Sequence, residues 1–253
     1  MNFTTGFLLK IWQIIKNRTF FYWWTFMFVE KMGKTKTIFQ GKDGLINILF
    51  KDTVTGTNGQ MDSGGNEVVG KMEDKGRASL IVSTYFFKKL RAFGISTHYI
   101  STDTNSLTMI AELAEVFGDG LEFVCRRYAY GSFVRRYRDY IQKMEKLPYL
   151  VEVTIKDDER GDPLINDDAV VALGIMSLEE LNEAKELTKK ITRIIELDLE
   201  EKGLKLIDLK LEFGKIDEGI VLIDEISGDC MRVEKDGVLL NQVELYEALI
   251  AEN

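Results

Sequence analysis

Residues 204–213 constrain the fold more than any other part of this 253-residue chain, because apolar and ionisable side chains alternate strictly along the second half of that segment. The apolar positions are Ile207, Leu209, Leu211 and Phe213, and the ionisable positions are Asp208, Lys210 and Glu212. Successive side chains of a strand point to opposite faces of its sheet. The pattern therefore predicts a strand with one face on a hydrophobic core and the other face on bulk water or a polar cleft.

The segment before this strand is predicted to be a long helix over residues 178–202. Ser177 followed by Glu180 forms a capping-box pattern, and Gly203 stands where helices commonly end. Shorter helices are predicted at 78–93 and 132–144, strands at 97–101, 107–111, 121–127 and 220–223, a hairpin at 34–51 and a glycine-rich loop at 52–76. Strands at both ends with helices between them indicate an α+β fold in two lobes.

Composition excludes several classes of protein. A hydrophobic content of 45% with 11% aromatic residues excludes a disordered chain. Two cysteines without a CxxC pair exclude a disulfide scaffold and favour a reducing cytoplasm. The single histidine, His98, excludes His-rich metal sites and disfavours a Ser-His-Asp triad. A net charge of −8 argues against a nucleic-acid partner, which requires a positive surface.

The first 26 residues differ from the rest of the chain, because they contain basic but no acidic side chains. The basic residues are Lys10, Lys16 and Arg18, which leaves a net charge of −11 for residues 27–253. They limit the apolar stretches to about 10 residues, too short to span a bilayer, and no small-residue cleavage site follows. A membrane anchor and a secretory signal are therefore not favoured. Residues 1–26 are interpreted as an atypical extension, with Met27 or Met32 as the natural start.

The ionisable face of the strand at 204–213 is a candidate site because Asp224 and Glu225 follow the next predicted strand. A hairpin can bring Asp224 beside Lys210 and Glu212, and carboxylates of that kind suit Mg²⁺ bound together with nucleotide phosphates. Sequence does not fix the register, because a slip of one residue would place Asp224 on the opposite face. The alternative is an ordinary solvated face of an edge strand.

A second candidate site is basic and surrounds Gly131 at a strand-to-helix boundary. Its residues are Arg126, Arg127, Ser132, Arg135 and Arg136. Guanidinium groups, a hydroxyl and helix N-terminal amides together predict a phosphate or carboxylate site. The alternative, a basic patch for RNA, is disfavoured by the acidic charge of the chain. Lys34 and Lys36 share one face of the first hairpin and could both meet nucleotide phosphates.

Taken together, these motifs resemble the SAICAR synthetase family, the phosphoribosylaminoimidazole-succinocarboxamide synthases, over about residues 27–232. In the first half the matching motifs are Gly33-Lys34-Thr35-Lys36, Phe50-Lys51-Asp52, Lys75-Gly76 and residues 94–98. In the second half they are Arg126 through Gly131-Ser132, Lys156-Asp157-Asp158 with Asp162-Pro163, residues 208–214 and Asp224-Glu225 through Arg232. The last two motifs are specific to the family.

The resemblance implies an α+β fold of two lobes with antiparallel sheets and an ATP cleft between the lobes. Residues 27–118 would form the N-terminal nucleotide-binding lobe, and residues 119–253 the C-terminal lobe that binds substrate and metal. In the family, ATP activates the carboxylate of carboxyaminoimidazole ribonucleotide as an acyl phosphate, and the amine of aspartate attacks it to form an amide of de novo purine biosynthesis. The implied cofactors are ATP and Mg²⁺, the implied partners are small-molecule substrates, and a homodimer is left open.

The resemblance also implies roles for individual residues. ATP would be contacted by Gly33, Lys34 and Lys36, and Mg²⁺ would be held by Glu212 and Asp224. The reaction centre would be lined by Lys156, Asp162 and Lys210. The ribonucleotide would be bound by Asp52, Arg126, Ser132, Asp208 and Arg232, with its phosphate at Arg126, Ser132 and Arg232 and its imidazole at Asp208.

The chain departs from the family pattern mainly in its substrate half. Arg127 stands where the family usually has asparagine, Ser79-Leu80 replaces an Asn-Asn pair, and Gly228 replaces proline. The segment 60–74 is also longer than expected, and 233–253 lacks a later substrate motif. Two further hypotheses follow: a divergent paralogue that ligates another carboxylate and amine, and a nucleotide-binding protein without turnover.

Overall fold

Antiparallel sheets dominate the computed structural model, which describes residues 29–62, 64–65, 67–217 and 219–251. The first sheet has the order β1(Val29–Met32), β2(Lys36–Gln40), β3(Leu45–Phe50), β8(Thr108–Glu112) and β7(Tyr99–Asp103). A small sheet has the order β5(Gln60–Met61), β4(Thr53–Thr57) and β6(Glu67–Lys71). The predicted hairpin at 34–51 is confirmed as β2 and β3, with Ile38 opposite Ile48.

The second sheet carries the alternating strand that the sequence predicts. Its order is β11(Lys146–Ile155), β10(Leu121–Tyr128), β12(Lys205–Ile216), β14(Met231–Lys235) and β15(Val238–Leu239), and β13(Gly219–Ile223) and β9(Glu115–Val116) also pair with β12. Main-chain hydrogen bonds of 3.0 Å from His98 N to Leu222 O and from Leu222 N to Ser96 O join β13 to the segment that precedes β7. This link places the end of β13 beside the first sheet.

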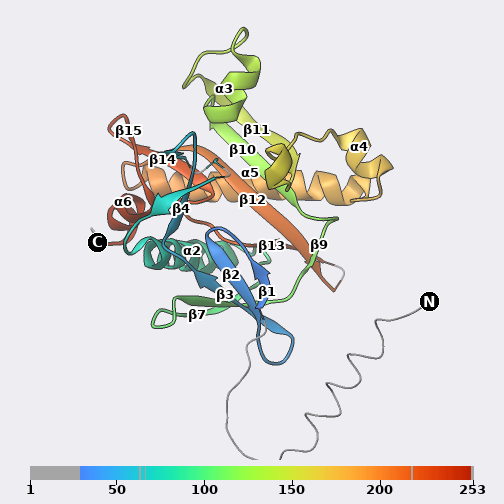
Figure 1. The fold of residues 1–253 in the computed structure, drawn as a ribbon. Coiled ribbons are helices and arrows are strands. Elements are labelled where there is room, and N and C mark those ends of the chain that lie inside the picture. The colour runs from blue at the N-terminus through green and yellow to red at the C-terminus, as the bar shows by residue number, and fades with distance from the viewer. Residues whose placement is uncertain (1–28, 63, 66, 218, 252–253) are drawn as a thin grey trace, which may run out of the picture.

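Two long helices cover the sheets, and the helix at 178–202 is confirmed. Figure 1 shows α5(Leu178–Glu200) crossing β10 and β12, against which it packs, and α2(Lys75–Ala92) beside the first sheet. The Ser177 and Glu180 side chains form the predicted capping box. The remaining helices are α3(Gly131–Tyr137), η1(Asp158–Arg160), α4(Asp167–Ala172), α6(Gln242–Tyr246) and η2(Glu247–Ala251). One continuous hydrophobic core joins both large sheets with α2 and α5.

Two local predictions are wrong. The glycine-rich segment 52–76 is not a loop, because β4, β5 and β6 lie within it. Its glycines allow close backbone approach: a Cβ on Gly56 would stand 2.0 Å from Gln60 O, and one on Gly65 would stand 2.1 Å from the carbonyl carbon of Gly56. The helix expected at 132–144 ends at Tyr137, after which the chain turns back into β11. No described helix is long and apolar enough to cross a membrane.

Candidate active site

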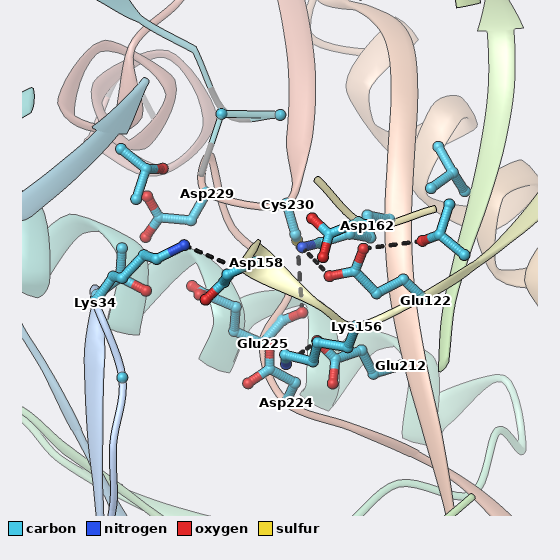
Figure 2. A pocket seen from close by; sticks show the side chains of 18 of the residues that line it. Lys34, Glu122, Lys156, Asp158, Asp162, Glu212, Asp224, Glu225, Asp229 and Cys230 are labelled. Atoms are coloured by element: carbon cyan, nitrogen blue, oxygen red, sulfur yellow. Dashed lines mark hydrogen bonds and ion pairs between the residues drawn. The ribbon is translucent and has the colours of Figure 1, made fainter. Parts of the chain in front are cut away.

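A cavity of about 480 Å³ lies between the first sheet, the β5–β6 connection and the ionisable face of β12. Its walls include residues 31–36 of the first sheet, Gly64 and Gly65 of the connection, and side chains from β10, β11, β12 and β14. The cavity is mostly polar, and the charged groups within it come from parts of the chain that are far apart in sequence. Figure 2 shows several of these groups pointing toward one another.

The cavity floor is built by strand register. Glu122, Val124 and Arg126 of β10 stand opposite Glu212, Lys210 and Asp208 of β12, and Asp208 also stands opposite Arg232 of β14. Residues directly opposite in an antiparallel pair share one face of the sheet. The alternation in β12 is therefore continued by its neighbours, while residues such as Phe123 and Leu209 are buried on the opposite face.

Two lysine amines at this floor each pair with a carboxylate. Lys210 Nζ donates to Glu122 Oε1 at 2.6 Å, and Glu122 also accepts from the Thr154 hydroxyl at 3.1 Å. Lys156 Nζ donates to Glu212. Burial alone would lower the pKa of Lys210, but Glu122 and Glu212 raise it well above its ordinary value. The pKa of Lys156 is raised in the same way by Glu212 and Asp224. Both amines are therefore fixed positive charges at neutral pH.

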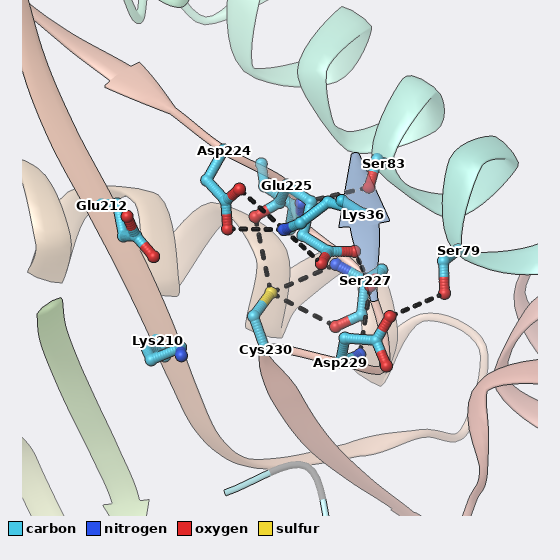
Figure 3. Close-up of polar contacts among 12 residues, drawn as sticks. Lys36, Ser79, Ser83, Lys210, Glu212, Asp224, Glu225, Ser227, Asp229 and Cys230 are labelled. Atoms are coloured by element: carbon cyan, nitrogen blue, oxygen red, sulfur yellow. Dashed lines mark hydrogen bonds and ion pairs between the residues drawn. The ribbon is translucent and has the colours of Figure 1, made fainter. Parts of the chain in front are cut away.

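Asp224 links the two large sheets, because it follows β13 of the second sheet and pairs with Lys36 of the first. In the β12–β13 register Glu212 stands opposite Ile223, so Asp224 follows directly, with a left-handed φ of 66°. Figure 3 shows Lys36 of β2 between Asp224 and Glu225; its Nζ donates to the two Asp224 oxygens at 2.6 and 2.7 Å and to Glu225 at 2.6 Å. Burial would raise the pKa of Asp224, but Lys36, Lys156 and Lys210 hold it well below its usual range.

Behind Asp224 lies His98, which is almost fully buried. Its Nε2 is 3.2 Å from the main-chain oxygen of Asp224. Burial lowers the pKa of His98 to about 4, so the ring is neutral at pH 7. The neutral ring can support the backbone of Asp224 by donating a hydrogen bond from Nε2.

Glu212 and Asp224 are a chemically suitable pair for Mg²⁺. Burial and the Asp224 carboxylate raise the pKa of Glu212, a repulsion that a bound cation would relieve. Among the described residues no group of three or more His, Cys, Asp or Glu side chains could hold a metal ion. Nucleotide-bound Mg²⁺, however, usually needs only one or two carboxylates, because phosphate and water oxygens complete its shell. The donor set therefore fits Mg²⁺ that arrives with a nucleotide.

The opposite end of the cavity is dominated by guanidinium groups. Arg126 donates to Glu152 at 2.5 Å, to Ser132 Oγ at 3.1 Å and to Asp208 at 3.4 Å. Arg232 donates to Asp208 at 2.7 Å. These side chains come from four adjacent strands and from the start of α3. Forked guanidinium donors of this kind match a phosphate or a carboxylate.

The cavity mouth brings together residues of the two predicted lobes. Lys34 Nζ lies 2.7 Å from the carboxylate of Asp158 in η1 (Figure 2). Asp162 lines the same side and accepts a hydrogen bond from Asp157 N at 2.8 Å. Gly33 N donates to Lys36 O at 2.9 Å and shapes the turn that carries both lysines.

Among the sequence-predicted site residues, Arg127 does not line the cavity, and neither does Asp52. Its carboxylate accepts from Gly76 N at 2.9 Å at the start of α2. Asp52 therefore shapes the connection into α2, and its contact with substrate stays a prediction. All other predicted site residues line the cavity.

Comparison with known proteins identifies the family. The family model described as SAICAR synthetase matches residues 30–238. The chain belongs to the SAICAR synthetase family. The phosphoribosylaminoimidazole-succinocarboxamide synthase of Clostridium tetani is 48% identical over 226 residues, which covers 88% of this chain and all of that relative. The synthase of Methanocaldococcus jannaschii is 36% identical and covers 79% of each chain.

Solved structures of SAICAR synthetases confirm the α+β fold. A SAICAR synthetase in complex with ADP superposes with a TM-score of 0.79 at 31% identity, covering 88% of this chain and 98% of the other. The SAICAR synthetase of Pyrococcus horikoshii OT3 gives a TM-score of 0.76 at 31% identity, covering 86% and 98%. The chain is therefore an enzyme of this ligase type, and the hypothesis of a nucleotide-binding protein without turnover is not supported.

The most conspicuous departure from the SAICAR synthetase pattern lies outside the cavity. Arg127 points to the opposite face of β10 from Arg126, donates to Glu196 of α5 at 2.8 and 2.9 Å, and lies 3.7 Å over the Tyr149 ring. Ser79 likewise contacts buried Asp229, which pairs with Lys75. Arg127 is therefore a structural contact away from the cavity, whereas Ser79 contacts a carboxylate that lines it.

Three acidic residues at the site were not predicted from the sequence: Glu122, which lines the cavity, and Glu152 and Asp62, which contact its arginines. Glu122 alternates with Val124 and Arg126, so the period-two pattern of β10 could have indicated it. Glu152 lies on β11, a strand that was not predicted. No local sequence pattern indicates Asp62, because its partner Arg232 is 170 residues away in the chain.

Proposed function

We propose that this enzyme joins aspartate to the carboxylate of carboxyaminoimidazole ribonucleotide through an acyl phosphate, with hydrolysis of ATP to ADP. The observation that carries the proposal is the cavity itself. Within a SAICAR synthetase fold, one cavity holds lysines suited to nucleotide phosphates, a carboxylate pair suited to Mg²⁺ and arginines suited to a phosphorylated substrate. ATP, magnesium and a ribonucleotide can therefore meet in one place.

On the nucleotide side, Gly33, Lys34 and Lys36 would contact the ATP phosphates. The related enzyme solved with ADP supports nucleotide binding by this fold. Glu212 and Asp224 would hold Mg²⁺, which when bound neutralises charge on the transferring phosphoryl group. We propose that residues 27–118 act as the nucleotide-binding lobe, with Lys36 bringing its charge to the carboxylates of the C-terminal lobe.

On the substrate side, Arg126, Ser132 and Arg232 would bind the ribonucleotide phosphate, with Asp208 beside the imidazole. Lys156, Asp162 and Lys210 would then line the reaction centre. Lys156 and Lys210 remain protonated because carboxylates raise the pKa of each amine. They stabilise the negative charge that develops on the transferring and carboxylate oxygens, and they do not act as bases. Most of the catalysis would come from positioning and electrostatics, as is usual for phosphoryl transfer.

An omission assay tests this function in the full chain. ADP release should require ATP, Mg²⁺, carboxyaminoimidazole ribonucleotide and aspartate together, and the product should have the mass of the succinocarboxamide. Chelation of Mg²⁺ should abolish release, because the developing phosphoryl charge would lose its counter-ion. ADP release that persists without aspartate or without the ribonucleotide, or an absence of amide product, would contradict the proposal.

A further inference from the structure

All three guanidinium nitrogens of Arg232 donate hydrogen bonds to carboxylates of the same chain. Nη1 donates to Asp208 at 2.7 Å, while Nη2 and Nε donate to Asp62 Oδ1 at 2.6 and 3.1 Å. A guanidinium can bind a phosphate or carboxylate through two parallel hydrogen bonds on either of two edges, Nε with Nη2 or Nη1 with Nη2. Asp62 occupies Nη2, which belongs to both edges, and therefore competes with a substrate phosphate on either one.

Arg232 has little freedom to offer another edge. Its guanidinium lies between two glycines, because a Cβ on Gly64 would stand 2.3 Å from Nη2 and one on Gly131 would stand 3.1 Å from it. The side chain of Arg232 is only 10% exposed. An incoming phosphate must therefore share or take the edge that Asp62 occupies.

Main-chain hydrogen bonds hold the backbone of Asp62 in place. Its N–H donates to Thr55 O of β4 at 3.1 Å, and its carbonyl accepts from Gly65 N at 2.9 Å. Gly64 N also donates to the Asp62 carboxylate at 3.1 Å. Its side chain is 24% exposed, so the carboxylate can turn toward solvent without exchanging one buried partner for another.

Asp62 also changes the charge of this end of the cavity. The guanidinium groups are Arg126, Arg135, Arg136 and Arg232, and the carboxylates that face them are Asp62, Glu152 and Asp208. Together these groups carry a net charge of about +1. When the Asp62 carboxylate turns away, the remaining groups carry about +2, which balances the two negative charges of a phosphate dianion.

We propose that Asp62 competes with the substrate phosphate for Arg232 and so weakens the binding of any phosphate group at this site. This inference rests on the proposed function, in which Arg232 binds a phosphorylated ribonucleotide. A free phosphate gains only the guanidinium contacts and must displace Asp62 for them. A ribonucleotide gains further contacts at Asp208 and the reaction centre, which offset the loss of the internal ion pair. The cost of displacing Asp62 is common to both ligands, so Asp62 weakens a small anion below useful binding while the ribonucleotide keeps its affinity through its other contacts.

The test compares Asp62→Asn with wild type and with Glu67→Gln, an exposed carboxylate on β6 of the same small sheet. Asparagine keeps an oxygen that accepts from Arg232 but removes the competing charge. Inorganic phosphate binding is measured by calorimetry at low ionic strength, with saturating ADP and Mg²⁺ occupying the nucleotide side. Phosphate should bind Asp62→Asn about three- to tenfold more tightly than wild type, the range between an exposed and a desolvated charge contact. Glu67→Gln should match wild type.

Kinetics give a second readout. In Asp62→Asn the KM for the ribonucleotide and the inhibition constant of inorganic phosphate should both fall by a similar factor, while the KM for ATP stays at the wild-type value. Equal, weaker or absent phosphate binding in Asp62→Asn, or an increased KM for the ribonucleotide, would overturn the proposal. If the enzyme made no amide at all, the proposed function would fail, but the calorimetric comparison would still test whether Asp62 competes with phosphate. Failure of the proposed function and failure of the Asp62 proposal are therefore distinguishable.

Discussion

Asp224→Asn and Glu212→Gln are each expected to lower kcat by about a thousandfold, as the loss of a preorganised electrostatic group in an active site commonly does. Either change removes one of the two carboxylates proposed to hold Mg²⁺. Each amide keeps the shape of the side chain and can still accept from Lys36 or Lys156. Asparagine also tolerates the left-handed φ of 66° at position 224, so the backbone is not strained.

Asp236→Asn is the matched control for this prediction. Asp236 is an exposed aspartate with a left-handed φ of 53°, and it does not line the cavity. The measurements are ADP release at saturating substrates, the Mg²⁺ concentration that gives half-maximal rate, and the midpoint of thermal unfolding. The control should keep full activity. Wild-type turnover at ordinary Mg²⁺ in either Asp224→Asn or Glu212→Gln would contradict the assignment of the metal ligands.

Arg126→Lys is expected to raise the KM for the ribonucleotide by about 10- to 100-fold, because a charge-assisted contact to phosphate contributes about 1.5–3 kcal/mol. Lysine keeps the charge but cannot reach Glu152, Asp208 and Ser132 as the forked guanidinium does. The KM for ATP should change less than about twofold, because Arg126 lies at the other end of the cavity from Lys34.

The adjacent arginine provides the control for Arg126→Lys. Arg127 is buried to the same degree but contacts Glu196 on the far face of β10. Arg127→Lys should lower the midpoint of urea unfolding while leaving the KM for the ribonucleotide unchanged. Initial rates at varied ribonucleotide, together with urea denaturation of both variants, separate binding from stability. An unchanged KM in Arg126→Lys would place the substrate phosphate elsewhere.

Local patterns in the sequence were sufficient to predict the elements that carry the floor of the cavity. The alternation in residues 207–213, the capping box at Ser177 and the hairpin at 34–51 each depend on side-chain periodicity or on a local hydrogen bond, which the sequence records directly. The family resemblance then gave roles to individual residues, and all of these residues except Asp52 line the cavity.

The remaining features depend on contacts between distant residues. Lys36 and Asp224 are separated by 188 residues, and the register that puts Asp224 beside Glu212 was open because a slip of one residue reverses the face. The small sheet at 53–71 was missed because its glycines were interpreted as loop formers, although they permit close strand packing. Arg127 was interpreted as a change on the substrate side because sequence alone did not show the direction of its side chain.

The most direct test of the central claim follows an isotope through the reaction. The ribonucleotide is prepared with ¹⁸O in its carboxylate and incubated with the full chain, ATP, Mg²⁺ and aspartate, and the released phosphate is analysed by mass spectrometry. An acyl phosphate forms when a carboxylate oxygen bonds to the γ-phosphorus, and that oxygen leaves with phosphate when the amine attacks the carbonyl carbon. The account predicts one ¹⁸O in each phosphate released with amide product; unlabelled phosphate formed alongside the amide would contradict it.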